Sequence, residues 1–153
     1  MNQPQLDTEK ININIGISST YWGKKPQYAI SIDDIELLNT KYTEKSDVIV
    51  YHNFTVDLET NKPHTLSISL LNKTDRDTIE NDDKTAILKD MLLNIESIEI
   101  EDIELGMLKW SHSKFVPIDS HRPTLTKCTN LGWNGHFQIE FSCPFYIWLL
   151  ENS

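Results

Sequence analysis

The octet Ile30-Ser31-Ile32-Asp33-Asp34-Ile35-Glu36-Leu37 occurs a second time as Ile98-Glu99-Ile100-Glu101-Asp102-Ile103-Glu104-Leu105. The copies differ only by Ser for Glu at the second position and by Asp for Glu at the fourth. In both, apolar and polar residues alternate, the alternation stops at an acidic pair, and it resumes out of phase. A strand, a tight turn and a return strand produce this pattern, because Asp tolerates the positive φ of hairpin turns. The sequence therefore predicts two β-hairpins.

Other segments also alternate with a period of two, which is typical of half-buried strands. The clearest are residues 10–17, with Ile at every second position, and residues 48–58, 64–71 and 136–141. No segment shows the periodicity of an amphipathic helix of three turns. We therefore predict an all-β fold, a single antiparallel β-sandwich of the jelly-roll type. Residues 1–9 are expected to form a flexible tail, and residues 10–153 to form one sandwich domain.

The chain is acidic, with 14 basic and 23 acidic residues and a formal net charge of −9. Such a chain repels phosphate backbones, and since Lys24-Lys25 is its only basic doublet, we expect no nucleic-acid partner. No stretch approaches the ~20 apolar residues that span a bilayer, and no signal peptide is recognisable at the start, so no membrane partner is expected and the location is left open. Motifs of hydrolases, metallopeptidases and nucleotide-binding enzymes are absent, which favours a protein that is not an enzyme.

The segment from Asn72 to Asp90 breaks the strand periodicity and carries six acidic residues. Calcium takes six to eight oxygen ligands, which carboxylates on a flexible loop can supply. The spacing is not that of an EF-hand, and a solvated acidic loop is the alternative interpretation. The candidate metal ligands are Asp75, Asp77, Asp82, Asp83 and Asp90.

The same segment supports a resemblance. Leu71-Asn72, the acidic loop and then Asp90-x-x-Leu93-x-Ile95-Glu96-x-Ile98 resemble calcium-dependent carbohydrate-binding modules of the xylan-binding β-sandwich kind. Those modules carry Asn-Asp after one strand and Asp-Arg-Asn-Leu-x-Val-Asp-x-Ile before the next. Here Lys73 stands in place of the Asp of Asn-Asp, and Met91-Leu92 replaces Arg-Asn. The resemblance implies a β-sandwich whose loop binds calcium, which in turn coordinates sugar hydroxyls.

Two tryptophans are candidates for sugar contact. Trp22 and Trp133 each lie beside a glycine in predicted loops, where an exposed indole can stack on the apolar face of a sugar ring. Asn134, next to Trp133, is a candidate for hydrogen bonds to hydroxyl groups. The alternative for each tryptophan is that its ring closes the end of the sandwich core.

The C-terminal run Pro144-Phe145-Tyr146-Ile147-Trp148-Leu149-Leu150 is almost entirely apolar. Because such a run must be covered, we expect it either to complete the core or to dock on another copy of a virion protein. Together with Gly132-Trp133-Asn134-Gly135, this end of the chain resembles small proteins encoded by marine tailed phages. That resemblance implies a virion or host-recognition setting.

Two functions therefore compete. The first is a non-catalytic carbohydrate-binding module, calcium-dependent and virion-associated, that binds a polysaccharide or a cell-surface glycan. The alternative is a phage structural protein, a decoration or tail-associated subunit, that contacts other proteins and binds no sugar.

Overall fold

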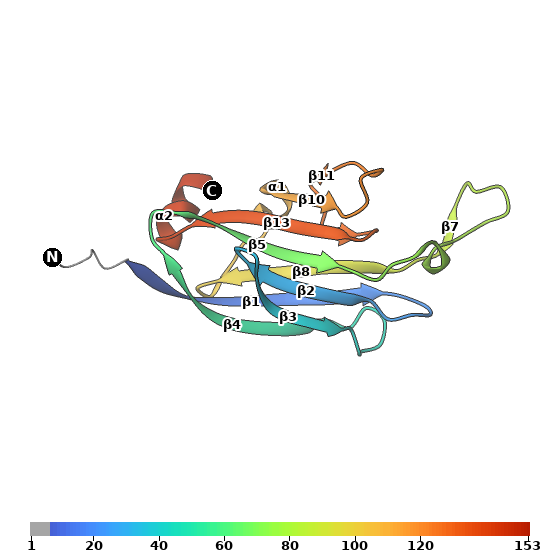
Figure 1. Ribbon diagram of the computed structural model, residues 1–153, viewed down its shortest axis with the longest axis horizontal. Helices are drawn as coiled ribbons and strands as arrows, with labels where there is room; N and C mark the ends of the chain where they lie inside the picture. Colours follow the sequence, from blue (N-terminus) through green and yellow to red (C-terminus); the bar gives the residue numbers. More distant parts are fainter. Residues whose placement is uncertain (1–6) are drawn as a thin grey trace.

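Two β-sheets pack face to face in a computed structural model that describes residues 7–153 (Figure 1). The first sheet has the strand order β12-β8-β1-β4, with β9 paired to β8, and the second has the order β11-β10-β13-β5-β2-β3. All strand pairs are antiparallel. The predicted all-β fold, an antiparallel β-sandwich of the jelly-roll type, is confirmed. The bounds of these strands are β1 Thr8–Thr20, β2 Gln27–Ile32, β3 Ile35–Lys41, β4 Val50–Glu59, β5 Pro63–Leu70, β8 Leu92–Ile100, β9 Ile103–Glu104, β10 Ser113–Pro117, β11 Leu125–Thr126, β12 Asn130–Leu131 and β13 Gly135–Ser142.

Both octets form two-residue hairpins, as predicted. The first joins β2 to β3, and its turn residues Asp33 and Asp34 have φ values of 51° and 65°. The second joins β8 to β9, where Glu101 and Asp102 have φ values of 52° and 63°. Positive φ at both central positions gives the turn a twist that matches the twist of the strands. The two copies lie in different sheets, so each sheet contains one of them.

The first acidic residue of each turn also joins its hairpin to the next strand of the same sheet. The Asp33 N–H donates to the carbonyl of Thr65 in β5, and the Thr65 N–H donates back to Asp33 Oδ1 at 2.9 Å. Glu101 repeats this with Asn12 in β1, whose N–H lies 2.7 Å from Glu101 Oε1. Each octet thus contains a turn and a side-chain acceptor for a neighbouring strand.

The remaining elements are short. The 3-10 helix η1 (Asp75–Asp77) precedes a two-stranded hairpin of β6 (Ile79–Glu80) and β7 (Ile87–Lys89), which projects from one end of the sandwich (Figure 1). Helix α1 (Leu108–Ser111) precedes β10, and helix α2 (Phe145–Asn152) ends the chain. Among residues 7–153, no helix combines the length and the apolar character that a membrane crossing requires.

The core lies between the sheets, and alternate residues of β1, β2, β5 and β13 fill it. The C-terminal run contributes to this core through one side of α2: Phe145 is fully buried, and Trp148 and Leu149 pack against the cluster. The other side of α2 leaves Tyr146, Ile147 and Leu150 exposed. Core completion therefore accounts for part of the run.

Two residues of the predicted tail, residues 1–9, belong to a strand instead. Thr8 and Glu9 begin β1, because the facing residues Glu59 and Leu58 at the end of β4 pair with them. Residues 1–6 of that prediction lie outside the described residues.

Candidate functional site

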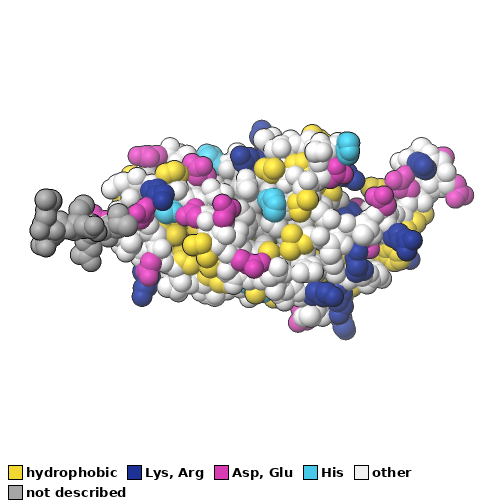
Figure 2. All heavy atoms as spheres, viewed as in Figure 1, with side chains coloured by type: hydrophobic (Ala, Val, Ile, Leu, Met, Phe, Trp, Pro, Cys, Tyr) yellow, Lys and Arg dark blue, Asp and Glu magenta, His cyan; other side chains and the backbone are white. Residues whose placement is uncertain are grey.

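A cleft of about 540 Å³ opens at the end of the sandwich that carries the β6–β7 hairpin. Three segments build it: the stretch between β5 and β8, the loop after β10, and the loop between β12 and β13. Charged side chains of both signs gather at this end of the molecule (Figure 2). The cleft is lined by Lys73, Thr74, Asp75, Thr78, Glu80, Ile87, Asp90, Asp119, Arg122, Gly132, Trp133 and Asn134.

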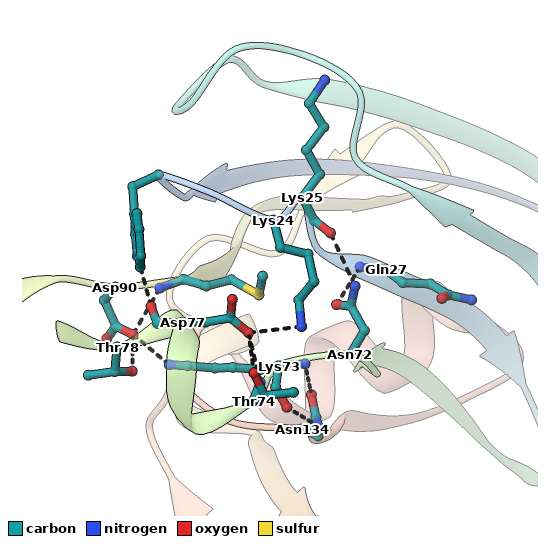
Figure 3. Close-up of polar contacts among 12 residues, drawn as sticks. Lys24, Lys25, Gln27, Asn72, Lys73, Thr74, Asp77, Thr78, Asp90 and Asn134 are labelled. Atoms are coloured by element: carbon teal, nitrogen blue, oxygen red, sulfur yellow. Dashed lines mark hydrogen bonds and ion pairs between the residues drawn. The ribbon is translucent and has the colours of Figure 1, made fainter.

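Asn134 fastens two of these segments together. Its Oδ1 accepts the N–H of Lys73 at 2.7 Å, and its Nδ2 donates to the Lys73 carbonyl at 2.9 Å (Figure 3). The side chain thus imitates one rung of a β-ladder between the end of β5 and the start of β13. Asn134 lines the cleft, and both polar atoms of its amide are bonded to the backbone of Lys73, so its predicted role in ligand binding stays a prediction.

Trp133 lies in the cleft wall with its ring packed on other side chains. Its ring and that of Phe115 are stacked with centroids 5.7 Å apart, and the Arg122 guanidinium carbon lies 4.6 Å from its centroid. The indole N–H is buried and has no hydrogen-bond partner in the described part of the chain. The ring therefore packs on the buried ring of Phe115 and also lines the cleft, and its contact with a sugar stays a prediction.

Trp22 is 44% exposed, and it is held beside the acidic segment. Its indole N–H donates to the carbonyl of Asp77 at 2.9 Å, and the Lys89 ammonium lies 5.3 Å from the ring centroid. Trp22 is outside the lining of the cleft but is anchored to η1, whose first residue, Asp75, lines it. An aromatic ring is thus available on the surface next to the cleft.

Two of the predicted metal ligands are paired with lysines. Asp77 Oδ2 lies 3.0 Å from the Lys24 ammonium, and Asp90 Oδ1 lies 2.6 Å from the Lys73 ammonium (Figure 3). Burial by itself would raise the pKa of Asp77, but the Thr74 N–H and Lys24 outweigh it and lower that pKa. The pKa of Asp90 is also lowered, because hydrogen bonds from Lys73 and Thr78 outweigh the effect of burial. Both carboxylates are therefore held in the ionised form by protein groups.

The other three predicted ligands lie apart from that pair. Asp75 is exposed at the cleft, whereas Asp82 and Asp83 are exposed in the turn of the projecting hairpin, where Asp83 accepts the Thr85 hydroxyl at 2.7 Å. Within residues 7–153, no three His, Cys, Asp or Glu side chains converge in a way that could hold a metal ion. The five aspartates therefore do not fit one calcium ion, which needs six to eight oxygen ligands around it.

Several cleft residues carry no signal in the sequence. Asp119 and Arg122 come from the non-periodic stretch after β10, and Ile87 comes from the acidic hairpin. The loops that carry Asp119 and Lys73 meet because the second sheet places the ends of β5 and β10 on either side of the start of β13, where Gly135 is paired to both Leu70 and Pro117. Long-range pairing of this kind cannot be deduced from residue spacing.

The chain has the kind of fold found in carbohydrate-binding modules. Among solved structures it is similar to a protein described as vCBM60 in complex with galactobiose, with a TM-score of 0.55 and 6% sequence identity over 84% of this chain and 96% of that one. At this identity the likeness concerns the fold alone. No protein-family model matches the chain, and no curated protein matches it in sequence.

Proposed function

We propose that the chain is a non-catalytic carbohydrate-binding module whose ligand, a neutral oligosaccharide segment of a polysaccharide or cell-surface glycan, lies in the cleft between η1 and Trp133. The observation that carries this proposal is the combination of groups in the cleft. Trp133 and Ile87 offer apolar surface, while Asp75, Asp119 and Arg122 offer hydrogen-bonding groups. Sugars present both an apolar face and hydroxyl groups, so they require both kinds of contact.

Size and position support the same ligand class. A cleft of about 540 Å³ lies within the range of ordinary small-molecule sites. The exposed ring of Trp22 extends the surface beside η1, where a longer glycan chain would continue. The fold is also similar to that of a protein solved in complex with galactobiose.

Isothermal titration calorimetry with galactobiose and xylo-oligosaccharides tests this proposal. Asp75→Ala should weaken the binding of a recognised oligosaccharide by about tenfold, because one charge-assisted hydrogen bond to a hydroxyl is lost. Asp82→Ala is the matched control, since Asp82 is an exposed aspartate of the same segment outside the cleft. The proposal would be contradicted if none of these oligosaccharides bound, or if Asp75→Ala and Asp82→Ala bound the same oligosaccharide with equal affinity.

A second proposal is a virion structural subunit that contacts other protein copies. The observation in its favour is the exposed side of α2, where Tyr146, Ile147 and Leu150 are 51%, 54% and 78% exposed. Light scattering at micromolar concentration distinguishes the two proposals. An oligomer that dissociates on Leu150→Glu supports assembly, whereas a strict monomer contradicts it.

A further inference from the structure

Lys73 is a lysine with little access to solvent at the point where the three segments of the cleft meet. Its side chain is only 9% exposed, and its ammonium lies 2.6 Å from Asp90 Oδ1 and 2.6 Å from the carbonyl oxygen of Gly132 (Figure 3). A buried ammonium is costly unless charged and polar acceptors surround it. Here one acceptor, Asp90, lies two residues before β8, and the other, Gly132, lies in the loop after β12.

The backbone of Lys73 is also hydrogen-bonded to the β12–β13 loop. Both the N–H and the carbonyl of Lys73 pair with the amide of Asn134, two residues beyond Gly132. The end of β5 is therefore joined to the β12–β13 loop by the ammonium of Lys73 and by its peptide groups. Removal of the ammonium would leave the backbone contacts in place but would leave the Asp90 carboxylate without its cation.

Asp90 collects several donors on one oxygen. Besides the ammonium, Oδ1 accepts the hydroxyl of Thr78 at 2.7 Å and the N–H of Met91 at 2.8 Å. The Lys73 ammonium is thus bonded to one carboxylate oxygen and one carbonyl oxygen, and the Thr78 hydroxyl supports the carboxylate. Carboxylate and backbone carbonyl oxygens are also the ligands that calcium takes in loop sites.

We propose that the ammonium of Lys73 is a covalently attached cation that takes the place of a bound metal ion and assembles the cleft without calcium. The proposal rests on a disagreement. The chain resembles calcium-dependent carbohydrate-binding modules, yet the described residues of this site do not form a set of calcium ligands. Lys73 stands at the position where the resembling modules have Asp, so the charge at this position is reversed. Its ammonium contacts Asp90, the residue that matches the Asp of the second motif. The proposal concerns how the cleft is held together, and it stands whether or not a sugar binds there.

Thermal unfolding of the wild-type protein gives the first test. Its Tm should be the same in millimolar calcium and in excess chelator, because the folded state offers calcium no site that the unfolded state lacks. A rise in Tm with calcium, or a fall with chelator, would overturn the proposal. This measurement needs no variant, so it decides the question even where a variant does not fold.

Two substitutions at Lys73 give the second test. Lys73→Met keeps an unbranched side chain that is one atom shorter and removes its charge, and we expect its Tm to fall by about 5–10 °C, since Asp90 is left without its cation. Lys24→Met is the matched control: its partner Asp77 is 11% exposed but Lys24 itself is 41% exposed, so the fall should be about 2 °C or less. Equal Tm values for Lys73→Met and the wild type would refute the role of the ammonium.

Lys73→Asp removes the ammonium and introduces a shorter side chain with a carboxylate, so that a calcium ion between Asp90 and the Gly132 carbonyl would have one more oxygen ligand available. This variant should be the least stable in chelator and should gain roughly 5 °C or more in saturating calcium. A Lys73→Asp protein that calcium does not stabilise would show that the ammonium does not stand where a cation can bind, and the proposal would fail.

Discussion

Asp33→Ala should destabilise the protein more than Glu101→Ala, although the two residues occupy the same position in the two octets. Each accepts one backbone N–H from a neighbouring strand. Asp33 alone has a second partner, since its Oδ2 lies 2.6 Å from Nδ1 of His64, a residue that is only 3% exposed. The other ring nitrogen of His64 contacts the carbonyl of Glu59 at 2.7 Å.

The size of each loss of stability follows from the contacts that each substitution removes. Loss of an exposed backbone hydrogen bond costs about 0.5–1.5 kcal/mol, which is the whole effect expected for Glu101→Ala. Asp33→Ala also leaves a buried ring nitrogen of His64 without a partner, which costs about 1–3 kcal/mol more. With about 2–4 °C per kcal/mol for a chain of this length, Tm should fall by roughly 3–18 °C for Asp33→Ala and by roughly 1–6 °C for Glu101→Ala.

Urea and thermal unfolding, followed by circular dichroism, measure both changes. The same Asp33→Ala substitution in a His64→Phe background isolates the buried contact, because no ring nitrogen is then left unpaired. There it should cost only the backbone hydrogen bond, about 1 kcal/mol. The reasoning is refuted if Asp33→Ala costs no more than Glu101→Ala, or if its cost is the same in the two backgrounds.

Gly135→Ala should destabilise the sandwich by about 1–3 kcal/mol, because an added Cβ would lie 2.6 Å from the carbonyl oxygen of Val116 and the strands must move apart. Gly23→Ala, whose Cβ would meet nothing within 4 Å, should leave Tm unchanged, and equal Tm values of the two variants would contradict this account. The unfolding free energy should fall in two steps as the pH is lowered. Burial lowers the pKa of His52, so stability is complete above its ordinary pKa of 6.5 and decreases below it. The pKa values of Asp77 and Asp90 lie below 3.8, so their contribution is complete above pH 3.8 and is lost as the pH falls through the lowered values. Urea titrations across the pH range measure both steps, and an upper step that survives in His52→Gln would show that another group causes it.

The fold could be predicted from the sequence wherever the signal was local. An acidic pair that interrupts two alternating runs is visible within eight consecutive residues, so both hairpins follow from the octets. Helix α2 was not predicted, because Phe145, Trp148 and Leu149 pack inward while Tyr146, Ile147 and Leu150 are exposed. Both sides are apolar, and such a helix has no hydrophobic periodicity to detect.

The site could be predicted only in part, because contacts between residues far apart in the sequence bring it together. Trp133 and Asn134, which the sequence suggested as candidates for sugar contact, do line the cleft, although the cleft itself was not predicted. Lys73 counted as a departure from the resembling motif, yet it forms an ion pair with Asp90, which lies 17 residues along the chain. Spacing along the chain does not reveal such a partner, because the fold of the intervening hairpin decides which loop residues meet.

The start of β1 and helix α2 lie at the end of the sandwich away from the β6–β7 hairpin (Figure 1). The strand register supports this arrangement. Thr8 pairs with Glu59 and Ser142 pairs with Pro63 at the end with the chain termini, whereas Gly135 pairs with Leu70 near the cleft. A resin, a fluorophore or a fused protein joined to either end of the described chain would therefore sit on the side remote from the cleft. Immobilisation through a terminal tag should leave the cleft open to soluble glycans and to insoluble polysaccharide alike.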